Sequence, residues 1–584
     1  MCGIACYLGK KRKASFLIDV LKRLEYRGYD SSGYANLTEN GFVVIKKSGS
    51  IANLENSLNS GDFVSAAISH TRWATHGEPN EENAHPHLSA NNIWAVVHNG
   101  IIENYLKLKS NLIKKPSSQT DTAVVSQFLE ENKVNNIFDF IDAFNFIAGS
   151  YAIVALNKNI KDTLFLAKNK NPLYISINDE GDFLVASDPS CFYGFSKSYY
   201  SFDDKEFAIL CKNSVKFYDK NKKEIIKHKN MLDDEIEFAK NEEYNHFMLK
   251  EIFEQKEKLQ NQINHYKNGV LTKFDDWFLT KFNDIKFIGC GTAFHAGLMG
   301  AKFVHKILNK NASCETASEF IYNEPNFISN KTLYIFVSQS GETADTLQAL
   351  ELVKQKNCIC VALTNVLYSS LAKKADYLLP ICAGQEIAVA STKAYVCMLS
   401  AIYMFCYYFK GIKEFFVATE NLKNLANHIL DFDKEKIKDL SNKIKDKKEA
   451  IFIGKDMDYI TALEASLKLK EVSYINANAY PSGELKHGFL ALVQKDTPLF
   501  VFANIDKTNQ KTLSSKSEAE ARGAESIVFS NSDDVCEINI KEKDSLLAQI
   551  EAIVPMQYLA YLTSVSKNIN PDKPRNLAKS VTVE

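Results

Sequence analysis

The spacing of apolar residues changes near residue 235, and this change constrains the fold more than any other feature of the sequence. Before it, short alternating apolar runs are separated by turn residues, which is typical of strands. These runs cover residues 42–45, 93–97, 151–156, 163–167 and 183–186. Helical patterns interrupt them at 14–25 and 121–131. The pattern predicts an α+β domain in which helices pack on stacked sheets.

After residue 235, helical patterns alternate with short buried runs that predict parallel strands. The first series has helices at 245–266, 293–308 and 343–356, and strands at 285–288, 333–337 and 358–363. The second follows a charged stretch at 431–449, with strands at 450–453, 498–503 and 526–530 and helices at 459–475, 514–523 and 543–562. We interpret the two series as two α/β parallel-sheet domains that arose by duplication.

The predicted domains follow from these patterns. We expect a first domain at 2–232, a charged linker at 233–244, parallel-sheet domains at 245–430 and 431–569, and a tail at 570–584.

The net charge is -1, from 70 basic and 71 acidic residues, which argues against a nucleic-acid partner. The longest uncharged run, 394–409, is shorter than the ~20 residues of a membrane span and predicts a buried helix.

The cellular compartment is predicted from the chain start and the cysteines. Charged residues begin at Lys10, too early for a signal peptide, so we expect a cytoplasmic protein without a membrane partner. The 12 cysteines lack both the density of a disulfide framework and any Cys-x-x-Cys pair, which predicts reduced thiols.

Cys2 is the second encoded residue. If Met1 is removed, Cys2 carries both a thiol and a free α-amine, and an amine with a pKa near ~8 can act as general base to the thiol. The alternative is an unreactive cysteine in a buried first strand.

Three segments favour the nucleophile: LEYRGYDSSG at 24–33, HTRWATHG at 70–77 and VHNGIIEN at 97–104. With Cys2-Gly3-Ile4 they resemble the glutamine amidotransferases of the N-terminal-nucleophile hydrolase class. Thiolate attack on an amide creates an oxyanion, which the side chain of Asn99 and the backbone of Gly100 are suited to stabilise.

The same resemblance implies a glutamine pocket. A free amino acid needs recognition of its carboxylate and ammonium groups, for which Arg72 and Asp121 match the family's positions. Trp73, Thr75 and His76 are implied to line the pocket. The alternatives are a surface ion pair for Arg72 and helix capping for Asp121.

In the second region, SQSGETAD at 338–345 follows an apolar strand and leads into a helix. Hydroxyl side chains and free N–H groups at a helix start suit a phosphate, although they also suit simple helix capping. The segment GCGTAFHAG at 289–297 has Phe294 where a dinucleotide fingerprint needs glycine, so no nicotinamide cofactor is expected. Both segments resemble the sugar isomerase (SIS) domain, which binds phosphosugars.

Three later segments narrow the resemblance: LKLKEVS at 467–473, SGELKHG at 482–488 and RNLAKSVTVE at 575–584. The whole chain, from Cys2 to Glu584, resembles the isomerising glutamine–fructose-6-phosphate aminotransferases. This family implies Glu471 as the isomerisation base, His487 as the ring-opening group from a neighbouring subunit, and Lys579 as the Schiff-base lysine. Lys468 completes the set. The alternatives are an ion pair between Lys468 and Glu471 and a solvated tail for Lys579.

The resemblance also implies a set of sugar-phosphate contacts and a homodimer or larger homo-oligomer. The contacts are Thr292, Ser338, Gln339, Ser340, Thr343, Val389, Ser391 and Ala578. Ala293 replaces the usual Ser, Ala388 a usual Gly and Phe489 a usual Pro. We expect these departures to tune sugar-phosphate binding rather than to abolish it.

His85 and His87 lack a convincing third ligand, so no metal is expected, and no other cofactor is implied.

The leading hypothesis is an enzyme that hydrolyses glutamine at Cys2 and passes ammonia internally to fructose 6-phosphate, giving glucosamine 6-phosphate and glutamate. Two alternatives stay open. One is a non-catalytic sugar-phosphate sensor, and the other is a related amidotransferase or deglycase acting on another phosphosugar, which Ala293 keeps under consideration.

Overall fold

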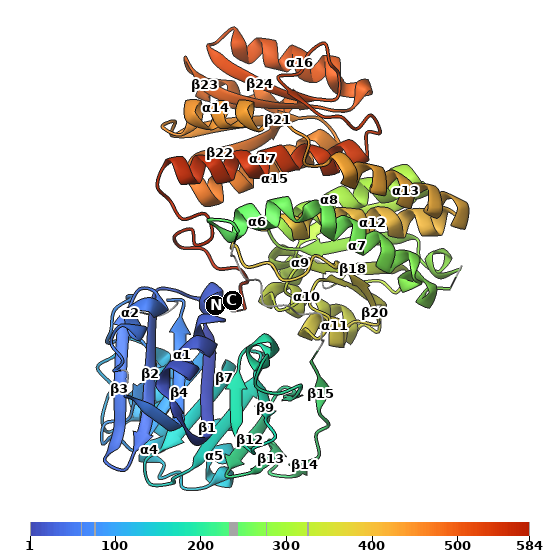
Figure 1. Ribbon diagram of the computed structural model, residues 1–584. Coiled ribbons are helices and arrows are strands. Elements are labelled where there is room, and N and C mark those ends of the chain that lie inside the picture. The colour runs from blue at the N-terminus through green and yellow to red at the C-terminus, as the bar shows by residue number, and fades with distance from the viewer. Residues whose placement is uncertain are drawn as a thin grey trace. The chain divides into compact units, whose positions relative to one another are not determined.

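The computed structural model describes residues 2–59, 61–74, 77–232, 243–275, 277–323 and 326–582 (Figure 1). The chain forms two compact units. The first contains the residues up to 238 together with the last five of the chain, and the second is Ala239–Lys579. Thr75, His76 and most of the expected linker, 233–242, lie outside the described residues.

The first unit is built on two antiparallel sheets. One has the order β15 (Asn230–Met231), β11 (Ser198–Ser201), β9 (Tyr174–Ile177), β10 (Phe183–Ala186), β1 (Gly3–Lys13), β4 (Phe63–Arg72), β2 (Ser31–Thr38) and β3 (Gly41–Ser48). The other has the order β14 (Glu224–Ile225), β13 (Ser214–Asp219), β12 (Glu206–Cys211), β8 (Thr163–Asn169), β7 (Gly149–Asn157), β6 (Trp94–Ile102) and β5 (His87–Leu88).

The alternation of side chains along β1 explains how these sheets stack. Ile4, Cys6 and Leu8 belong to a core shared with residues of the second sheet, such as Val97 and Val154. Residues of opposite parity pack under the helices α1 (Ala14–Lys22) and α2 (Ile51–Glu55). The helices α3 (Tyr105–Asn111), α4 (Asp121–Glu131) and α5 (Ile137–Phe144) contribute to a core with the second sheet. The unit therefore has helices outside two stacked sheets, as predicted.

The second unit contains two parallel sheets with the same topology. The first has the order β17 (Asn311–Thr316), β16 (Asp284–Gly289), β18 (Thr332–Ser338), β19 (Cys360–Thr364) and β20 (Tyr377–Pro380). The second has the order β22 (Asn476–Pro481), β21 (Glu449–Gly454), β23 (Thr497–Ala503), β24 (Ala524–Ser530) and β25 (Ile538–Asn539). In both sheets the first strand in the sequence lies between the second and the third, so the order of connection reverses beside it, where ligands bind in such folds.

Helices cover both faces of these sheets. Those of the first sheet are α6 (Phe247–Phe253), α7 (Gln255–Lys267), α8 (Thr292–Phe303), α9 (Ala317–Asn323), α10 (Ala344–Gln355), α11 (Ser370–Lys374), α12 (Lys393–Lys410) and α13 (Ile412–His428). Those of the second are α14 (Lys434–Ile444), α15 (Met457–Ser473), α16 (Asp506–Glu520) and α17 (Leu547–Ser566).

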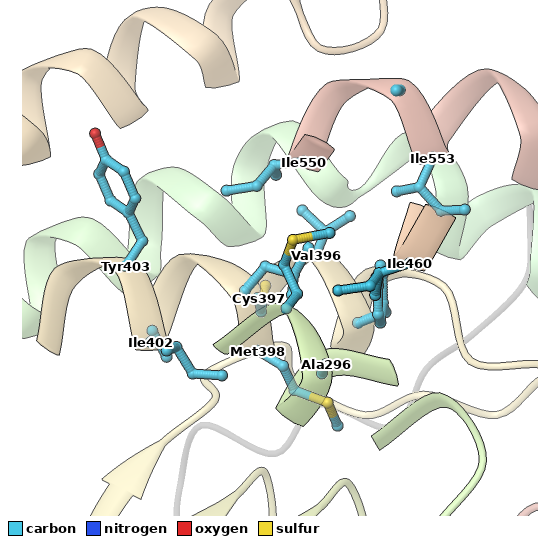
Figure 2. Packing of buried hydrophobic residues seen from close by; sticks show 14 of the residues in the cluster. Ala296, Val396, Cys397, Met398, Ile402, Tyr403, Ile460, Ile550 and Ile553 are labelled. Carbon is cyan, nitrogen blue, oxygen red and sulfur yellow. The ribbon is translucent and has the colours of Figure 1, made fainter. Parts of the chain in front are cut away.

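The two sheets of the second unit share one hydrophobic core. Figure 2 shows this core where α8, α12, α15 and α17 meet. Its labelled residues include Ala296, Met398, Ile402, Ile460 and Ile553. Because both sheets contribute to this cluster, the carboxyl end of the first sheet is fixed relative to α15.

The predicted fold class is confirmed, with corrections at particular elements. The expected helix 245–266 is two helices, α6 and α7, which meet at Glu254. In the second unit the strands β17, β20, β22 and β25 were not predicted, and in the first unit neither were interior strands such as β2, β4 and β12. The uncharged run 394–409 forms the buried helix α12, as expected. In the described ranges no helix has the length and apolarity needed to span a membrane.

Candidate active sites

The thiol of Cys2 lies against the peptide groups around Trp73. The Trp73 N–H donates to Cys2 Sγ at 3.3 Å, and the thiol contacts Trp73 O at 3.6 Å. These contacts follow from strand register, because β1 pairs with β4 and Gly3 lies opposite Thr71. Burial raises the pKa of Cys2, whereas the charge of Arg72 lowers it and that of Asp121 raises it. The structure therefore brings Cys2, Arg72, Trp73 and Asp121 together.

The Asn99-Gly100 pair lies on β6. Asn99 is buried, and its side-chain Nδ2 donates to Ser187 Oγ at 2.8 Å. Gly100 has a φ of +130°, and a Cβ there would lie 2.0 Å from Ser150 O. Only glycine fits this position, because a side chain would both strain the backbone and collide with β7.

Arg72 is buried at the end of β4, which excludes the surface ion pair considered from sequence. Its guanidinium donates to Gly77 O at 3.2 Å and Glu78 O at 3.3 Å. Asp121 accepts from the Ile102 N–H at 2.7 Å and from its neighbour's N–H at 2.9 Å. The capping role considered for Asp121 belongs instead to Thr120, whose side chain accepts from Ala123 N.

The predicted phosphate loop connects β18 to α10. Ser338 Oγ accepts from the Gly341 N–H at 3.0 Å and contacts Thr343 Oγ1 at 3.2 Å. Ser340 Oγ accepts from the Glu342 N–H at 3.2 Å. Thr343 occupies the N-cap position of α10 but makes no side-chain capping bond in the described structure. Gln339 lies in the same loop. Helix capping alone therefore does not account for these hydroxyl side chains.

A buried ionic cluster lies on α15 beside α8. The side chain of Lys468 is fully buried, and its Nζ lies 2.7 Å from Glu471 Oε2 and 3.4 Å from Glu464 Oε1. Lys468 also donates to Thr292 Oγ1 at 3.0 Å. Thr292 donates to Glu464 at 3.0 Å, and His295 contacts the other Glu464 oxygen at 2.7 Å.

The protonation states in this cluster depend on burial and charge. Burial and the charge of Glu464 raise the pKa of Glu471, although Lys468 opposes the rise. Burial alone would lower the pKa of Lys468, but Glu464 and Glu471 outweigh it and the pKa is raised. The ion pair between Lys468 and Glu471, which the sequence left open as an alternative, does form, and Glu471 is a carboxylate whose proton affinity exceeds the ordinary value.

Lys579 reaches this cluster from the tail. Its side chain is 4% exposed and forms an ion pair with the buried Glu386, so the solvated-tail alternative is wrong for this state. Glu386 also accepts from Ser391 Oγ at 3.0 Å and from the Thr392 N–H at 2.9 Å. Burial alone would raise the pKa of Glu386, but the charge of Lys579 and the backbone N–H groups of Thr392 and Ala394 outweigh burial and lower it.

The remaining predicted sugar contacts lie around this tail. Val389 N donates to Asp572 O at 3.2 Å, which joins the loop before α12 to the start of the tail. Ala578 is partly buried and adjacent to Lys579. The charges of Glu386 and Lys579 act on Lys468 and Glu471 respectively, so these four groups form one electrostatic cluster.

His487 is the exception among the predicted catalytic residues. It is exposed on the short 3₁₀ helix η6 (Ser482–His487). Within the described part of this chain, no hydrogen bond or ion pair joins it to Lys468, Glu471 or Lys579. A single chain does not place His487 in the cluster.

Family models match both regions. A glutamine amidotransferase domain matches residues 70–194, and a SIS domain matches residues 278–407 and 443–536. Along its whole length the chain is 39% identical to the isomerizing glutamine–fructose-6-phosphate aminotransferase of Fusobacterium nucleatum, all of which is covered. The chain is also 41% identical to the isomerizing glutamine–fructose-6-phosphate aminotransferase of Caldanaerobacter subterraneus, and the match covers 100% of both chains. The chain belongs to this aminotransferase family.

A solved structure supports the assignment of the second unit to the aminotransferase family. The C-terminal domain of the Francisella tularensis glucosamine-fructose-6-phosphate aminotransferase is 35% identical, with a TM-score of 0.54. The match covers 58% of this chain and all of that one. The fold class and the enzyme class expected from the sequence are thereby confirmed.

Two acidic residues of this aminotransferase were missed by the sequence reasoning. Glu464 lies four residues before Lys468 on α15, and this i, i+4 spacing is a signal that the sequence contains. Glu386 lies 193 positions from Lys579, and no local pattern links the two.

In the described residues no group of three or more His, Cys, Asp or Glu side chains is arranged to hold a metal.

Proposed function

We propose that this chain catalyses the glutamine-dependent amination and isomerisation of fructose 6-phosphate to glucosamine 6-phosphate and glutamate. The observation that carries the proposal is the presence of two separate chemical clusters, around Cys2 and around Lys468, in a chain whose relatives share its full length. We assign residues 2–232 to glutamine hydrolysis, 245–430 and 431–569 to the SIS domains, and 570–584 to the tail that closes the sugar site.

The glutamine step begins at Cys2. After removal of Met1, the α-amine of Cys2 accepts the thiol proton, and the thiolate attacks the glutamine amide. The amine returns the proton to the leaving nitrogen, so ammonia departs, and water then hydrolyses the thioester to glutamate and the free thiol. Arg72 and Asp121 bind the carboxylate and ammonium of glutamine, with Trp73, Thr75 and His76 lining the pocket. Asn99 Nδ2 and the backbone of Gly100 donate to the oxyanion. This chemistry requires a reduced thiol, which favours the cytoplasm.

The sugar step uses the ionic cluster of the second unit. Ser338, Gln339, Ser340 and Thr343, with Thr292, bind the phosphate at the carboxyl end of the first sheet. Val389, Ser391 and Ala578 contact the sugar. Lys579 leaves Glu386, loses its proton and attacks the C2 carbonyl of the open ketose, which releases water and forms a Schiff base. Ammonia then adds at C2 and displaces the Lys579 amine, which leaves the sugar imine.

Proton transfer between C1 and C2 is then assigned to Glu471. Its raised pKa brings it closer to the working pH, where a general base is most effective. Lys468 positions its carboxylate at 2.7 Å. In the described part of this chain His487 is exposed and has no hydrogen bond to these groups. We therefore assign its ring-opening role to a site that a second copy of the chain completes, and propose at least a homodimer.

The test is a paired product assay on the purified protein. Glutamate and glucosamine 6-phosphate are each quantified with glutamine present, with and without fructose 6-phosphate. Near-equal yields of the two products support coupled amidotransfer. Glutamate without amino sugar contradicts the proposed acceptor, and absence of glutamate contradicts the role of Cys2 and favours a sensor.

Ala293 gives one reason to test other acceptors in the same assay. It lies on the first turn of α8 and is buried, where the family resemblance leads us to expect a serine hydroxyl. A faster yield of amino sugar from a different ketose phosphate would assign the chain to that substrate.

A further inference from the structure

The side-chain amide of Asn99 is held on both sides by buried residues. On one side, His70 Nε2 lies 3.1 Å from Asn99 Oδ1 and 3.0 Å from His98 O. On the other side, Asn99 Nδ2 donates to Ser187 Oγ at 2.8 Å. His70 and Ser187 are both 0% exposed. Neither residue was given a role by the sequence or by the proposed mechanism.

The contacts of His70 determine which way the amide points. Burial lowers the pKa of His70 to about 3, so the imidazole is neutral and carries one ring proton. Nε2 faces a backbone carbonyl oxygen, which accepts and cannot donate, so the proton is on Nε2. The Asn99 atom beside it must then be the oxygen. A flipped amide would place N–H against N–H.

Ser187 connects this amide to the strand that carries the nucleophile. Its Oγ accepts from the Ile4 N–H at 2.9 Å, two residues beyond Cys2, as well as from Asn99. The backbones of Ser187 and Ile4 are also joined, through Ser187 N to Ile4 O at 3.1 Å. One hydroxyl therefore contacts both the start of β1 and the amide of β6.

We propose that His70 and Ser187 are positioning residues that hold the Asn99 amide with its nitrogen toward the reacting carbonyl. The nitrogen carries two hydrogens, of which Ser187 takes one and the oxyanion takes the other. This inference rests on the proposed role of Asn99 as an oxyanion donor. It goes beyond that role because it names the residues that fix the orientation of the donor.

The test compares Ser187→Ala with Ser69→Ala. Ser69 is a matched control, since it is also 0% exposed and also bonds to β1, through Ser69 Oγ to Ala5 O at 2.6 Å, but has no bond to Asn99. Loss of a whole oxyanion donor costs roughly 10²–10³-fold in kcat, so a misoriented donor should cost ~10–100-fold. We expect that loss in glutaminase kcat for S187A, with KM for glutamine within ~3-fold, and little change for S69A.

A second measurement separates positioning from general damage. Alkylation of Cys2 by iodoacetamide forms no oxyanion, so its rate should be nearly unchanged in S187A. Unchanged glutaminase kcat in S187A, an equal loss in S69A, or a matching loss of alkylation rate would each overturn the proposal. If S187A does not fold, S187C preserves the shape with a weaker acceptor and is judged by the same criteria. Absence of glutaminase activity in the wild type would instead refute the proposed function.

Discussion

The thiol of Cys2 is held by peptide atoms of Trp73, so a substitution at Cys2 removes the nucleophile without removing a side-chain partner. We expect Cys2→Ala to lose glutamate release by at least ~10³-fold, because no other group supplies the covalent step. Binding of fructose 6-phosphate, measured by calorimetry, should be unchanged. Cys6→Ala is the control, because Cys6 is fully buried on the same strand and should lose stability rather than activity. Equal glutaminase activity in C2A and wild type would contradict the assignment.

Glu471 permits a sharper test, because its neighbours remain satisfied when its charge is removed. In Glu471→Gln, Lys468 keeps Glu464 at 3.4 Å and Thr292 at 3.0 Å, so the fold should persist. Loss of a general base should lower isomerisation by ~10²–10⁴-fold while sugar-phosphate binding remains.

The pH dependence of Glu471 has a defined sign. Because its pKa is raised, the base form is lost as pH falls through a value above the ordinary range for glutamate, so the wild-type rate should rise with pH there. E471Q should lack this limb of the pH–rate profile. Lys470→Gln, at the exposed neighbouring position, is the control. A profile in E471Q that matches the wild type would assign the base to another group.

Contacts between residues close in the sequence were predictable in the candidate sites, whereas contacts between distant residues were not. Lys468 and Glu471 share a helical face at i, i+3, so their ion pair follows from local sequence. The pairing of Lys579 with Glu386 does not, because it depends on where the tail lies against the loop before α12. Ser187 likewise has no sequence signal of its own, since its role arises from the register of β1.

At the level of elements, β4, β5 and β6 carry or adjoin a cluster of buried histidines. The rings of His70 and His85 stack at 4.2 Å, and those of His85 and His87 lie 4.8 Å apart. Burial lowers the pKa of His70 to about 3 and those of His85 and His87 well below 6.5. All three are therefore neutral in the folded domain.

This cluster should make the first unit sensitive to acid. Below about pH 6.5 the unfolded histidines bind protons that the folded ones exclude, so stability is fully present above that pH and falls below it. Each histidine contributes a slope of ~1.4 kcal/mol per pH unit to the free energy of unfolding, and the three together contribute roughly 4 kcal/mol per pH unit. Denaturant unfolding at several pH values, followed by the fluorescence of the buried Trp94, measures this slope. His87→Gln should reduce it by about one third, and an unchanged slope would contradict the account.

In the second unit, the strands that sequence analysis missed are the edge strands of the two sheets. β17 and β22 each occupy the end of a sheet beside its first strand, and in β22 only Ala477 is fully buried. An edge strand packs on fewer neighbours, so its sequence lacks the continuous apolar run of a central strand such as β18. The central strands of the second unit were predictable, whereas interior strands of the first unit such as β4 and β12, and the order of strands within each sheet, were not.

At the scale of the whole molecule, the repeated sheet order supports duplication, but the two copies have different surroundings at the equivalent strand ends. In the first copy, the loop after β18 presents Ser338 and Ser340. In the second, Asn504 follows β23 and bonds the buried Asp458, with its N–H at 3.0 Å and its Nδ2 at 3.1 Å. The second copy therefore has a carboxylate where the first has hydroxyl side chains, and because a carboxylate repels a phosphate, our proposal places the sugar phosphate in the first copy.

The last prediction concerns the coupling of the two reactions, which no single cluster determines. Ammonia released into bulk water becomes protonated and loses its nucleophilicity, so efficient amination requires transfer without equilibration with solvent. By resemblance to the family, we propose that the Trp73 side chain, besides lining the glutamine pocket, also gates this transfer. Its ring packs edge-to-face with Tyr29 at 6.0 Å, whereas the contacts with Cys2 use only its peptide atoms.

Trp73→Ala should therefore separate hydrolysis from amination. The peptide contacts of the thiol survive the substitution, so we expect glutamate release within ~3-fold of wild type, while the yield of amino sugar per glutamate falls several-fold. Both products are measured in the same reaction. Trp73→Phe, which retains a ring against Tyr29, is the control, and its yield of amino sugar per glutamate should lie between those of wild type and W73A. An equal loss of glutamate and amino sugar in W73A would show that the side chain serves the glutamine pocket itself, because a gate affects only the fate of ammonia already released.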